Sequence, residues 1–222
     1  MEEEEINYWD NSQYESCQYA TRLLDKLRKI NEEVNRPIDI DEVRKAIYYA
    51  KKYHGSQMRQ SGEPYYSHPI EVAYMVAEYA ASKIPSYFRT DIIVTSILHD
   101  TIEDTKLTEK MIAYIFGEKV ASQVEALSRN KPHGKISSAE IMESLWLQKK
   151  HDVALIKIFD RKHNLQTVGA KSPEKIKKIV EETLKSFLSM CMYLEHSQLD
   201  DYLYELCCDA THKKSIYNID VF

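Results

Sequence analysis

Apolar residues recur every three to four positions along most of the chain, which is the pattern of amphipathic helices. Val43, Ala46, Ile47 and Ala50, for example, share one helical face. The pattern predicts about ten helices: 13–34, 39–55, 69–82, 91–98, 108–116, 118–128, 138–149, one beginning near 152, 172–195 and 199–208. The most apolar of them, 91–98, is expected to be the most buried. The chain is therefore predicted to be all-α.

Glycine and proline are scarce, with 5 Gly and 6 Pro among 222 residues. Sandwiches, barrels and Rossmann-type folds need many tight turns, so this composition disfavours them. Nothing between Asp39 and Thr211 resembles a linker. We therefore expect one domain over residues 12–212, with an acidic flexible tail at 1–11 and a C-terminal tail at 213–222.

Charge, apolar run length and cysteine content limit the kinds of partner and the cellular location that we expect. The formal net charge is -5 and there is no basic patch with interleaved aromatics, so nucleic acid is disfavoured as a partner. The longest apolar run, Ile92–Leu98, falls far short of the ~20 residues that span a bilayer, so no membrane partner is expected. Four cysteines without a C-x-x-C pair, behind an N-terminus that opens with four glutamates, predict a cytoplasmic protein.

The helix 91–98 runs into His99-Asp100, and Glu103 and Asp104 follow one turn later. Adjacent residues on a helix point about 100° apart, so His99 and Asp100 could both reach one ion. Three carboxylates at a buried helix end repel one another unless a cation compensates them. A hydrogen-bonded helix terminus is the alternative. The second such dipeptide, His151-Asp152, lies between lysines and is interpreted as a helix cap and surface pair.

Two further residues are candidates for the same ion. His68 stands at the entry of a helix, and Asp160 lies inside an apolar helix. Taken singly, His68 is a hydrogen-bonding entry residue and Asp160 a partner of Arg161 or Arg59. Together with His99-Asp100 they form a His₂Asp₂ set, which suits Mn²⁺ or another divalent first-row metal and excludes a structural Cys–zinc site. Water on such an ion has a lowered pKa, the usual route to metal-assisted hydrolysis.

Three ordered stretches carry a family resemblance. They read HGSQMRQSGEPYYSHPIEVA at 54–73, LHDTIEDT at 98–105 and FDRKHNLQT at 159–167. Each resembles a signature segment of the RelA/SpoT homologues, and the likeness covers about 43–188. The resemblance implies an all-α, single-domain HD-type metal phosphohydrolase that removes pyrophosphate from the 3′ position of the alarmone (p)ppGpp. Because the chain ends near where a synthetase domain would begin, a hydrolase-only small alarmone hydrolase is implied.

The resemblance also implies a role for each matching residue. The implied Mn²⁺ ligands are His68, His99, Asp100 and Asp160. Glu103 and Asp104 would position and activate the attacking water. Contacts to the guanine nucleotide would come from Arg59 and Ser61 on the base, Asn164 and Thr167 on the ribose and phosphate side, and Arg161 in a basic rim.

Two other functions remain open. Gln60 and Gln166 stand where the family commonly has cations, which fits an HD phosphohydrolase acting on another nucleotide, such as a 2′-phosphorylated dinucleotide. A sensor that binds alarmone without hydrolysing it is the third reading, and the complete set of charged residues counts against it. Residues 193–204, rich in Leu and Tyr, fit either core or the surface of a homodimer.

Overall fold

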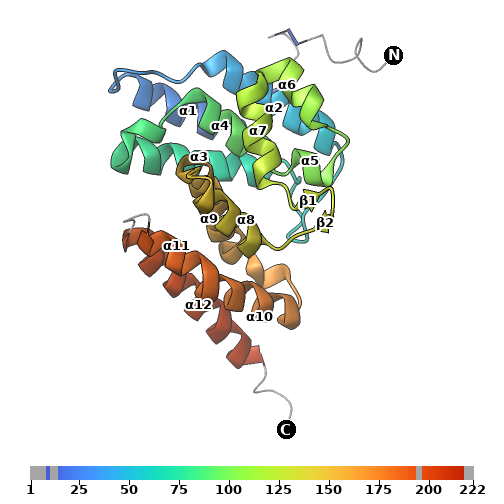
Figure 1. Ribbon diagram of the computed structural model, residues 1–222, viewed down its shortest axis with the longest axis vertical. Helices are drawn as coiled ribbons and strands as arrows, with labels where there is room; N and C mark the ends of the chain where they lie inside the picture. Colours follow the sequence, from blue (N-terminus) through green and yellow to red (C-terminus); the bar gives the residue numbers. More distant parts are fainter. Residues whose placement is uncertain (1–8, 11–14, 194–196, 218–222) are drawn as a thin grey trace. The chain divides into compact units, whose positions relative to one another are not determined.

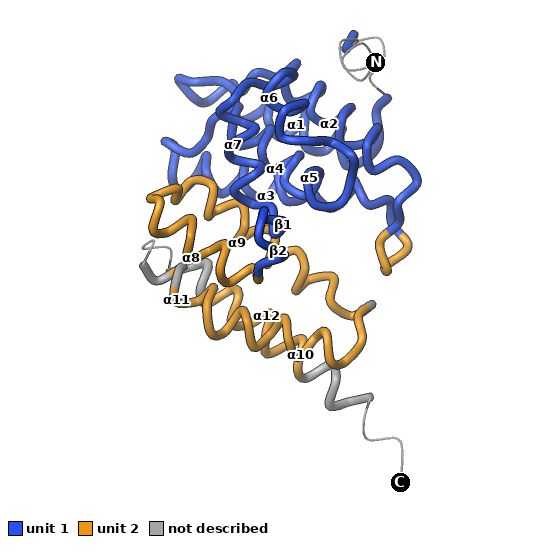
Figure 2. The backbone as a smooth tube through the Cα atoms, turned by 45° about the vertical axis from the view of Figure 1, so that its right-hand side comes forward, with its two compact units in different colours: residues 1–58, 63–136 blue, residues 59–62, 137–222 orange. Residues whose placement is uncertain are grey.

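The computed structural model describes residues 9–10, 15–193 and 197–217. It divides into two compact units (Figure 2): unit 1 is Met1–Met58 with Glu63–Ile136, and unit 2 is Arg59–Gly62 with Ser137–Phe222. The regular structure of both units is almost entirely helical, which confirms the all-α prediction. That the two units make up one domain stays a prediction.

Unit 1 is a helical bundle built around one apolar helix (Figure 1). Its elements are α1 (Gln18–Asn31), α2 (Ile40–His54), α3 (Ser67–Lys83), a 3₁₀ turn (Pro85–Tyr87), α4 (Thr90–Leu98), α5 (Thr101–Asp104), α6 (Glu109–Phe116), α7 (Glu118–Leu127), and the antiparallel strands β1 (Asn130–Lys131) and β2 (Gly134–Lys135). Helices α2, α3 and α7 pack around α4. Every residue from Ile92 to His99 is buried, so this helix is the core that the sequence predicted.

Several helix boundaries follow from local chemistry. The Asp39 side chain accepts hydrogen bonds from the backbone N–H of Asp41 and Glu42 at 2.9 and 3.1 Å, which caps α2 as predicted. Gly117 has φ +87°, a conformation that glycine adopts without strain, and it separates α6 from α7. Helix α3 begins two residues earlier than predicted, at Ser67, so His68 lies within its first turn.

The helix that carries His99 and Asp100 is interrupted, which the sequence did not predict. The Thr101 hydroxyl donates to the Leu98 carbonyl oxygen at 2.7 Å, and His99 Nδ1 lies 2.8 Å from the Ser96 carbonyl oxygen. These side chains take carbonyls that a continuing helix would bond, so α4 ends and α5 starts separately. The backbone N–H of Asp104 still donates to the Asp100 carbonyl oxygen at 2.9 Å, so Asp104 remains one helical turn beyond Asp100.

Unit 2 consists of helices around the third of the motif stretches, 159–167 (Figure 1). Its elements are α8 (Ser138–Leu147), α9 (His151–Gln166), a 3₁₀ turn (Val168–Ala170), α10 (Pro173–Glu182), a π-helical turn (Thr183–Phe187), α11 (Leu188–Tyr193) and α12 (Ser197–Tyr217). Helices α8 and α12 pack against α9, and nearly all of α9 up to Arg161 is buried.

The C-terminal helices differ from the prediction in their bounds. The predicted helix 172–195 runs without interruption from Pro173 to Tyr193 and contains a π-helical turn, and 194–196 lie outside the described residues. Helix α12 extends to Tyr217, so residues 213–217 of the expected tail are helical. Leu203 is buried whereas Tyr202 and Tyr204 are exposed, so this part of the Leu/Tyr-rich stretch contributes to both core and surface. Within the described ranges, none of the helices has the length and apolarity to cross a membrane.

Candidate metal centre

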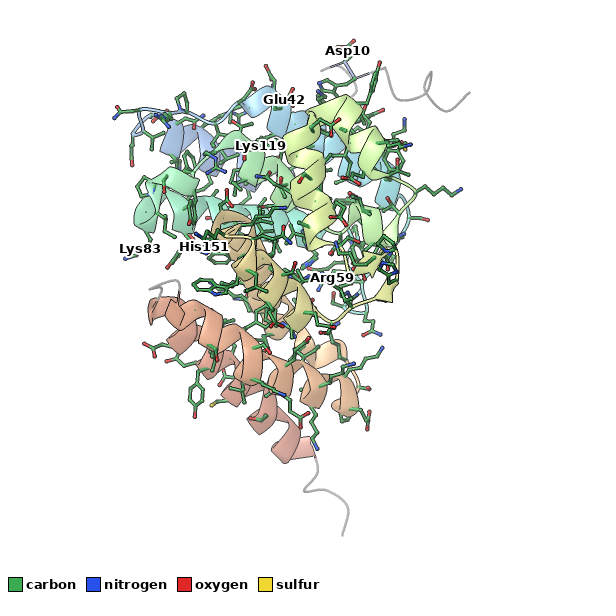
Figure 3. All side chains as sticks on the ribbon, in the orientation of Figure 1. Asp10, Glu42, Arg59, Lys83, Lys119 and His151 are labelled. Atoms are coloured by element: carbon green, nitrogen blue, oxygen red, sulfur yellow. The ribbon has the colours of Figure 1, made fainter. Side chains whose placement is uncertain are left out.

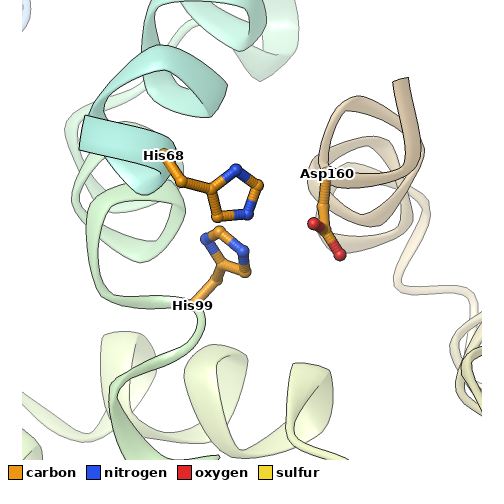
Figure 4. A group of neighbouring side chains, drawn as sticks. All are labelled: His68, His99 and Asp160. Atoms are coloured by element: carbon orange, nitrogen blue, oxygen red, sulfur yellow. The ribbon is translucent and has the colours of Figure 1, made fainter. Parts of the chain in front are cut away.

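Two buried histidines meet at the centre of unit 1. His68 lies in the first turn of α3 and His99 directly follows α4, and they are 2% and 1% exposed. Their ring centroids are 5.3 Å apart with the planes at 69° (Figure 4). A carbonyl oxygen only accepts hydrogen bonds, so the Ser96 carbonyl fixes the proton of His99 on Nδ1. The lone pair of Nε2 is then available to a metal ion.

Asp100 faces both rings. Its Oδ1 lies 3.1 Å from His99 Nε2, and its Oδ2 lies 3.5 Å from His68 Nε2. A carboxylate oxygen and an imine lone pair repel at this distance unless they share a cation, either a proton or a metal ion. Nitrogen and oxygen donors without a thiolate suit a divalent first-row metal. The residues present therefore fit such an ion.

Tyr65 links this group to Asp104 on α5. Its hydroxyl is 2.6 Å from Asp104 Oδ2 and 3.2 Å from Asp100 Oδ2. Burial raises the pKa of Asp104, and the negative charges of Asp100 and Glu103 raise it further, against the opposing hydrogen bond from Tyr65. A carboxylate with a raised pKa is a better proton acceptor than an ordinary aspartate.

Glu103 has different partners from its neighbour. Its side chain is 6% exposed and pairs with Arg129 and with Lys135, whose Nζ lies 2.8 Å from Oε1. Arg129 also donates from Nε at 2.9 Å and from its backbone N–H at 3.2 Å. Burial alone would raise the pKa of Glu103, but these donors outweigh it and the pKa is lowered. The positive charges that compensate Glu103 thus come from the protein itself, from Arg129 and Lys135.

Asp160 lies in α9 of unit 2 and is also fully engaged. Lys157 Nζ lies 2.8 Å from its Oδ2, and the Asn164 side-chain amide donates to its Oδ1 at 2.6 Å. The contact places Asn164 and Asp160 on one helical face. In these contacts the partners of Asp160 are Lys157 and Asn164, whereas the sequence suggested Arg161 or Arg59.

The predicted nucleotide-binding residues of unit 2 fall into two groups. Arg59, labelled in Figure 3, donates to the Thr167 hydroxyl at 3.0 Å, and Ser61 is exposed in the same segment. Arg161 is buried, pairs with Glu182 at 2.6 Å and lies 4.4 Å above the centre of the Phe187 ring. Its charge is therefore committed inside unit 2, not presented in a basic rim.

Four residues of these sites were missed from the sequence: Tyr65, Arg129, Lys135 and Lys157. A lysine within the apolar run 153–159 was a usable signal, because a buried lysine needs a partner. Arg129 and Lys135 gave none, since surface cations look alike in a sequence. The second His-Asp pair is not the cap that was expected: Lys150 occupies the N-cap position of α9, no side chain caps it, and the His151 ring stacks on Trp146 at 4.7 Å.

Comparisons with known proteins show the family of this chain. Residues 46–191 match the HD domain family. The chain is 33% identical over 190 residues to a Brucella ovis protein named GTP pyrophosphokinase rsh, covering 83% of this chain and 24% of that protein. It is 33% identical over 185 residues to the guanosine-3′,5′-bis(diphosphate) 3′-pyrophosphohydrolase of Aquifex aeolicus, covering 80% and 26%.

The bifunctional (p)ppGpp synthase/hydrolase SpoT of Escherichia coli is 31% identical over 199 residues, covering 86% of this chain and 27% of that protein. The chain thus spans about a quarter of the length of these curated relatives. A solved structure reported as a metazoan orthologue of SpoT that hydrolyses ppGpp has a TM-score of 0.58 at 16% identity, covering 78% of this chain and 95% of that one, and it shows the shared fold. The chain belongs to the HD domain family and is a homologue of the RelA/SpoT proteins.

Proposed function

We propose that the protein hydrolyses ppGpp or pppGpp to GDP or GTP plus pyrophosphate with the help of one divalent metal ion, Mn²⁺. The observation that carries this proposal is the convergence of His68, His99 and Asp100, in which the lone pair of His99 Nε2 faces a carboxylate oxygen and calls for a shared cation. The printed activities of the Aquifex and Escherichia relatives support the choice of substrate.

The fourth proposed ligand is Asp160, the third side chain drawn in Figure 4. It is buried, as are His68 and His99. A divalent ion bound by this set would lower the pKa of a water molecule and stabilise charge on phosphate oxygens. The choice of Mn²⁺ rests on the mixed nitrogen and oxygen donors.

Asp104 is the proposed acceptor of the water proton. Its raised pKa and its fixed position beside Asp100 support this role. The water oxygen would form a bond to the phosphorus nearest the ribose, and the bond from that phosphorus to the 3′ oxygen would break. The 3′ oxygen keeps the electron pair and gains a proton, and pyrophosphate leaves. Glu103, held by Arg129, would position the water without taking its proton.

Nucleotide contacts are assigned to the remaining predicted residues. Arg59 and Ser61 would hold the guanine, and Asn164 and Thr167 the ribose and phosphate side. The hydrogen bond between Arg59 and Thr167 supports this grouping, because it joins two of the four residues. For Arg161 we propose a supporting role through Glu182 in place of the direct contact expected from the sequence.

The decisive experiment measures pyrophosphate release from ppGpp by purified protein with Mn²⁺ and with EDTA. We expect turnover only with the metal, and none for Asp100→Ala. Asp152→Ala is the matched control, since it removes the aspartate of the other His-Asp pair and should leave turnover unchanged. A folded protein that binds Mn²⁺ but releases no pyrophosphate would refute the proposal.

The same assay decides between the substrates. Gln166 is neutral, so it provides no cation for a phosphate. Its side-chain amide donates to the Tyr202 hydroxyl at 3.3 Å. A panel with ppGpp, pppGpp and 2′-phosphorylated dinucleotides under identical conditions would show which of them is turned over. Tight ppGpp binding without turnover would favour the sensor.

We also propose a cytoplasmic location, supported by the free thiols of all four cysteines.

A further inference from the structure

Lys157 is a charged residue in the middle of an apolar helix. It lies in α9 between Ile156 and Ile158, and the whole residue is 5% exposed. Lysine is almost never buried to this extent without a partner, because its charge loses its hydration. The partner is Asp160, whose Oδ2 lies 2.8 Å from the ammonium nitrogen.

Both oxygens of Asp160 are held from its own helix. Lys157, three residues before it, takes Oδ2, and Asn164, four residues after it, donates to Oδ1. The amide of Asn164 is neutral, so Lys157 supplies the positive charge of the group. With side-chain exposures of 7% and 10%, water screens this lysine and aspartate little.

We propose that Lys157 is a built-in counter-cation for Asp160, which stabilises the metal-free protein and thereby weakens its affinity for the divalent ion. The inference rests on the proposed function, because it takes Asp160 as a metal ligand. Without metal, Lys157 is a cation in direct contact with the buried carboxylate. With metal, two cations share that carboxylate and repel each other, so Lys157 stabilises the metal-bound protein less than the metal-free protein.

A difference of this kind is a coupling between the lysine and the metal site. Whatever favours the metal-free state opposes binding by the same free energy. Removing the charge of Lys157 should therefore destabilise the protein in EDTA and at the same time tighten metal binding. A residue that only orients a ligand would have the opposite effect on affinity, since its removal would loosen the metal.

The test uses Lys157→Met, which keeps most of the side-chain length and removes the charge. Mn²⁺ affinity is measured by titration calorimetry on EDTA-treated protein, and stability by urea unfolding in EDTA and in saturating Mn²⁺. We expect affinity to rise about tenfold, within the usual range of such couplings. Lys157→Arg, which keeps the charge, should remain near the wild type. Lys177→Met is the matched control, because Lys177 forms an exposed pair with Glu181 on α10.

The outcomes separate this inference from the proposed metal centre. A wild-type protein that binds no Mn²⁺ refutes the metal centre itself. A wild type that binds Mn²⁺ while Lys157→Met binds it equally or more weakly overturns the role of Lys157 alone. Folding of Lys157→Met only in the presence of Mn²⁺ supports the role. If that variant folds in neither condition, the affinity of Lys157→Gln decides by the same criterion.

Discussion

The Tyr65 hydroxyl lies 2.6 Å from Oδ2 of Asp104, within the range of charge-assisted hydrogen bonds. The same hydroxyl is 3.2 Å from Asp100 Oδ2. The buried ring of His54 stacks on the Tyr65 ring at 4.6 Å and fixes the plane of the phenol. One side chain thus sets the spacing between the proposed metal ligand and the proposed proton acceptor.

Tyr65→Phe should lower kcat about tenfold or more while KM changes little, because it removes a hydrogen bond to a charged group without altering the ring. Steady-state pyrophosphate release measures both constants. Tyr66→Phe is the control, since Tyr66 is the neighbouring tyrosine and the centre of its ring instead lies 5.6 Å from Lys51 Nζ. Full activity of Tyr65→Phe would show that the spacing of Asp100 and Asp104 does not depend on the hydroxyl.

The Glu103–Arg129 pair anchors the β1–β2 hairpin to α5. Glu103→Gln should destabilise the protein by about 1–2 kcal/mol, less than a fully buried pair, because Arg129 is 40% exposed and can regain water. A double-mutant cycle with Arg129→Met, read by urea unfolding, should give a coupling of about 1 kcal/mol. Additive effects of the two substitutions would contradict the anchoring role.

The fold was largely predictable because each helix carries its own signal. Periodic apolar positions, the Asp39 cap and the turn at Gly117 are local features, and the structure keeps them. The break after Leu98 was not predictable in this way. It depends on the hydrogen bonds of Ser96, His99 and Thr101, whose side chains are compatible with a continuing helix until the tertiary structure buries them.

The site was predictable to the extent that its residues are close in sequence. His99 and Asp100 are adjacent, and Asn164 follows Asp160 by one helical turn, so spacing alone pairs them. The partners of Glu103 come from 26 and 32 residues further along, and no local pattern points to Arg129 or Lys135. Long-range ion pairs are set by the folded chain, and a single sequence does not reveal them.

Arg161 and Glu182 provide a test between structural support and nucleotide binding. The two side chains are 7% and 21% exposed, so removing either charge leaves the other poorly hydrated. Arg161→Met and Glu182→Gln should each lower the free energy of unfolding by about 3 kcal/mol, with similar KM for ppGpp. A rise in KM for Arg161→Met alone would instead place Arg161 at the substrate, as the sequence first suggested.

Asp91 joins α4 to α7 through a compact group of donors. Arg89 donates to both of its oxygens at 3.0 Å, Gln123 donates to Oδ2 at 3.0 Å, and Lys119 lies 3.0 Å from the same oxygen. Gln123 in turn accepts a hydrogen bond from the buried Thr95 hydroxyl at 2.7 Å. Burial alone would raise the pKa of Asp91, but these donors lower it to about 2.

A lowered pKa stabilises the folded state only while the carboxylate is ionised. The contribution of Asp91 should therefore be complete above its unfolded value of 3.8 and be lost as the pH falls toward about 2. Asp91→Asn should cost about 2 kcal/mol at pH 7, and this difference from the wild type should shrink between pH 4 and 2. Urea unfolding across that range measures this difference.

Asp25→Asn is the control, because Asp25 pairs with Arg28 at an exposed site, and its effect should be small at every pH. A cost of Asp91→Asn that is the same at pH 7 and pH 3 would show that packing, and not the charge, accounts for the role of Asp91.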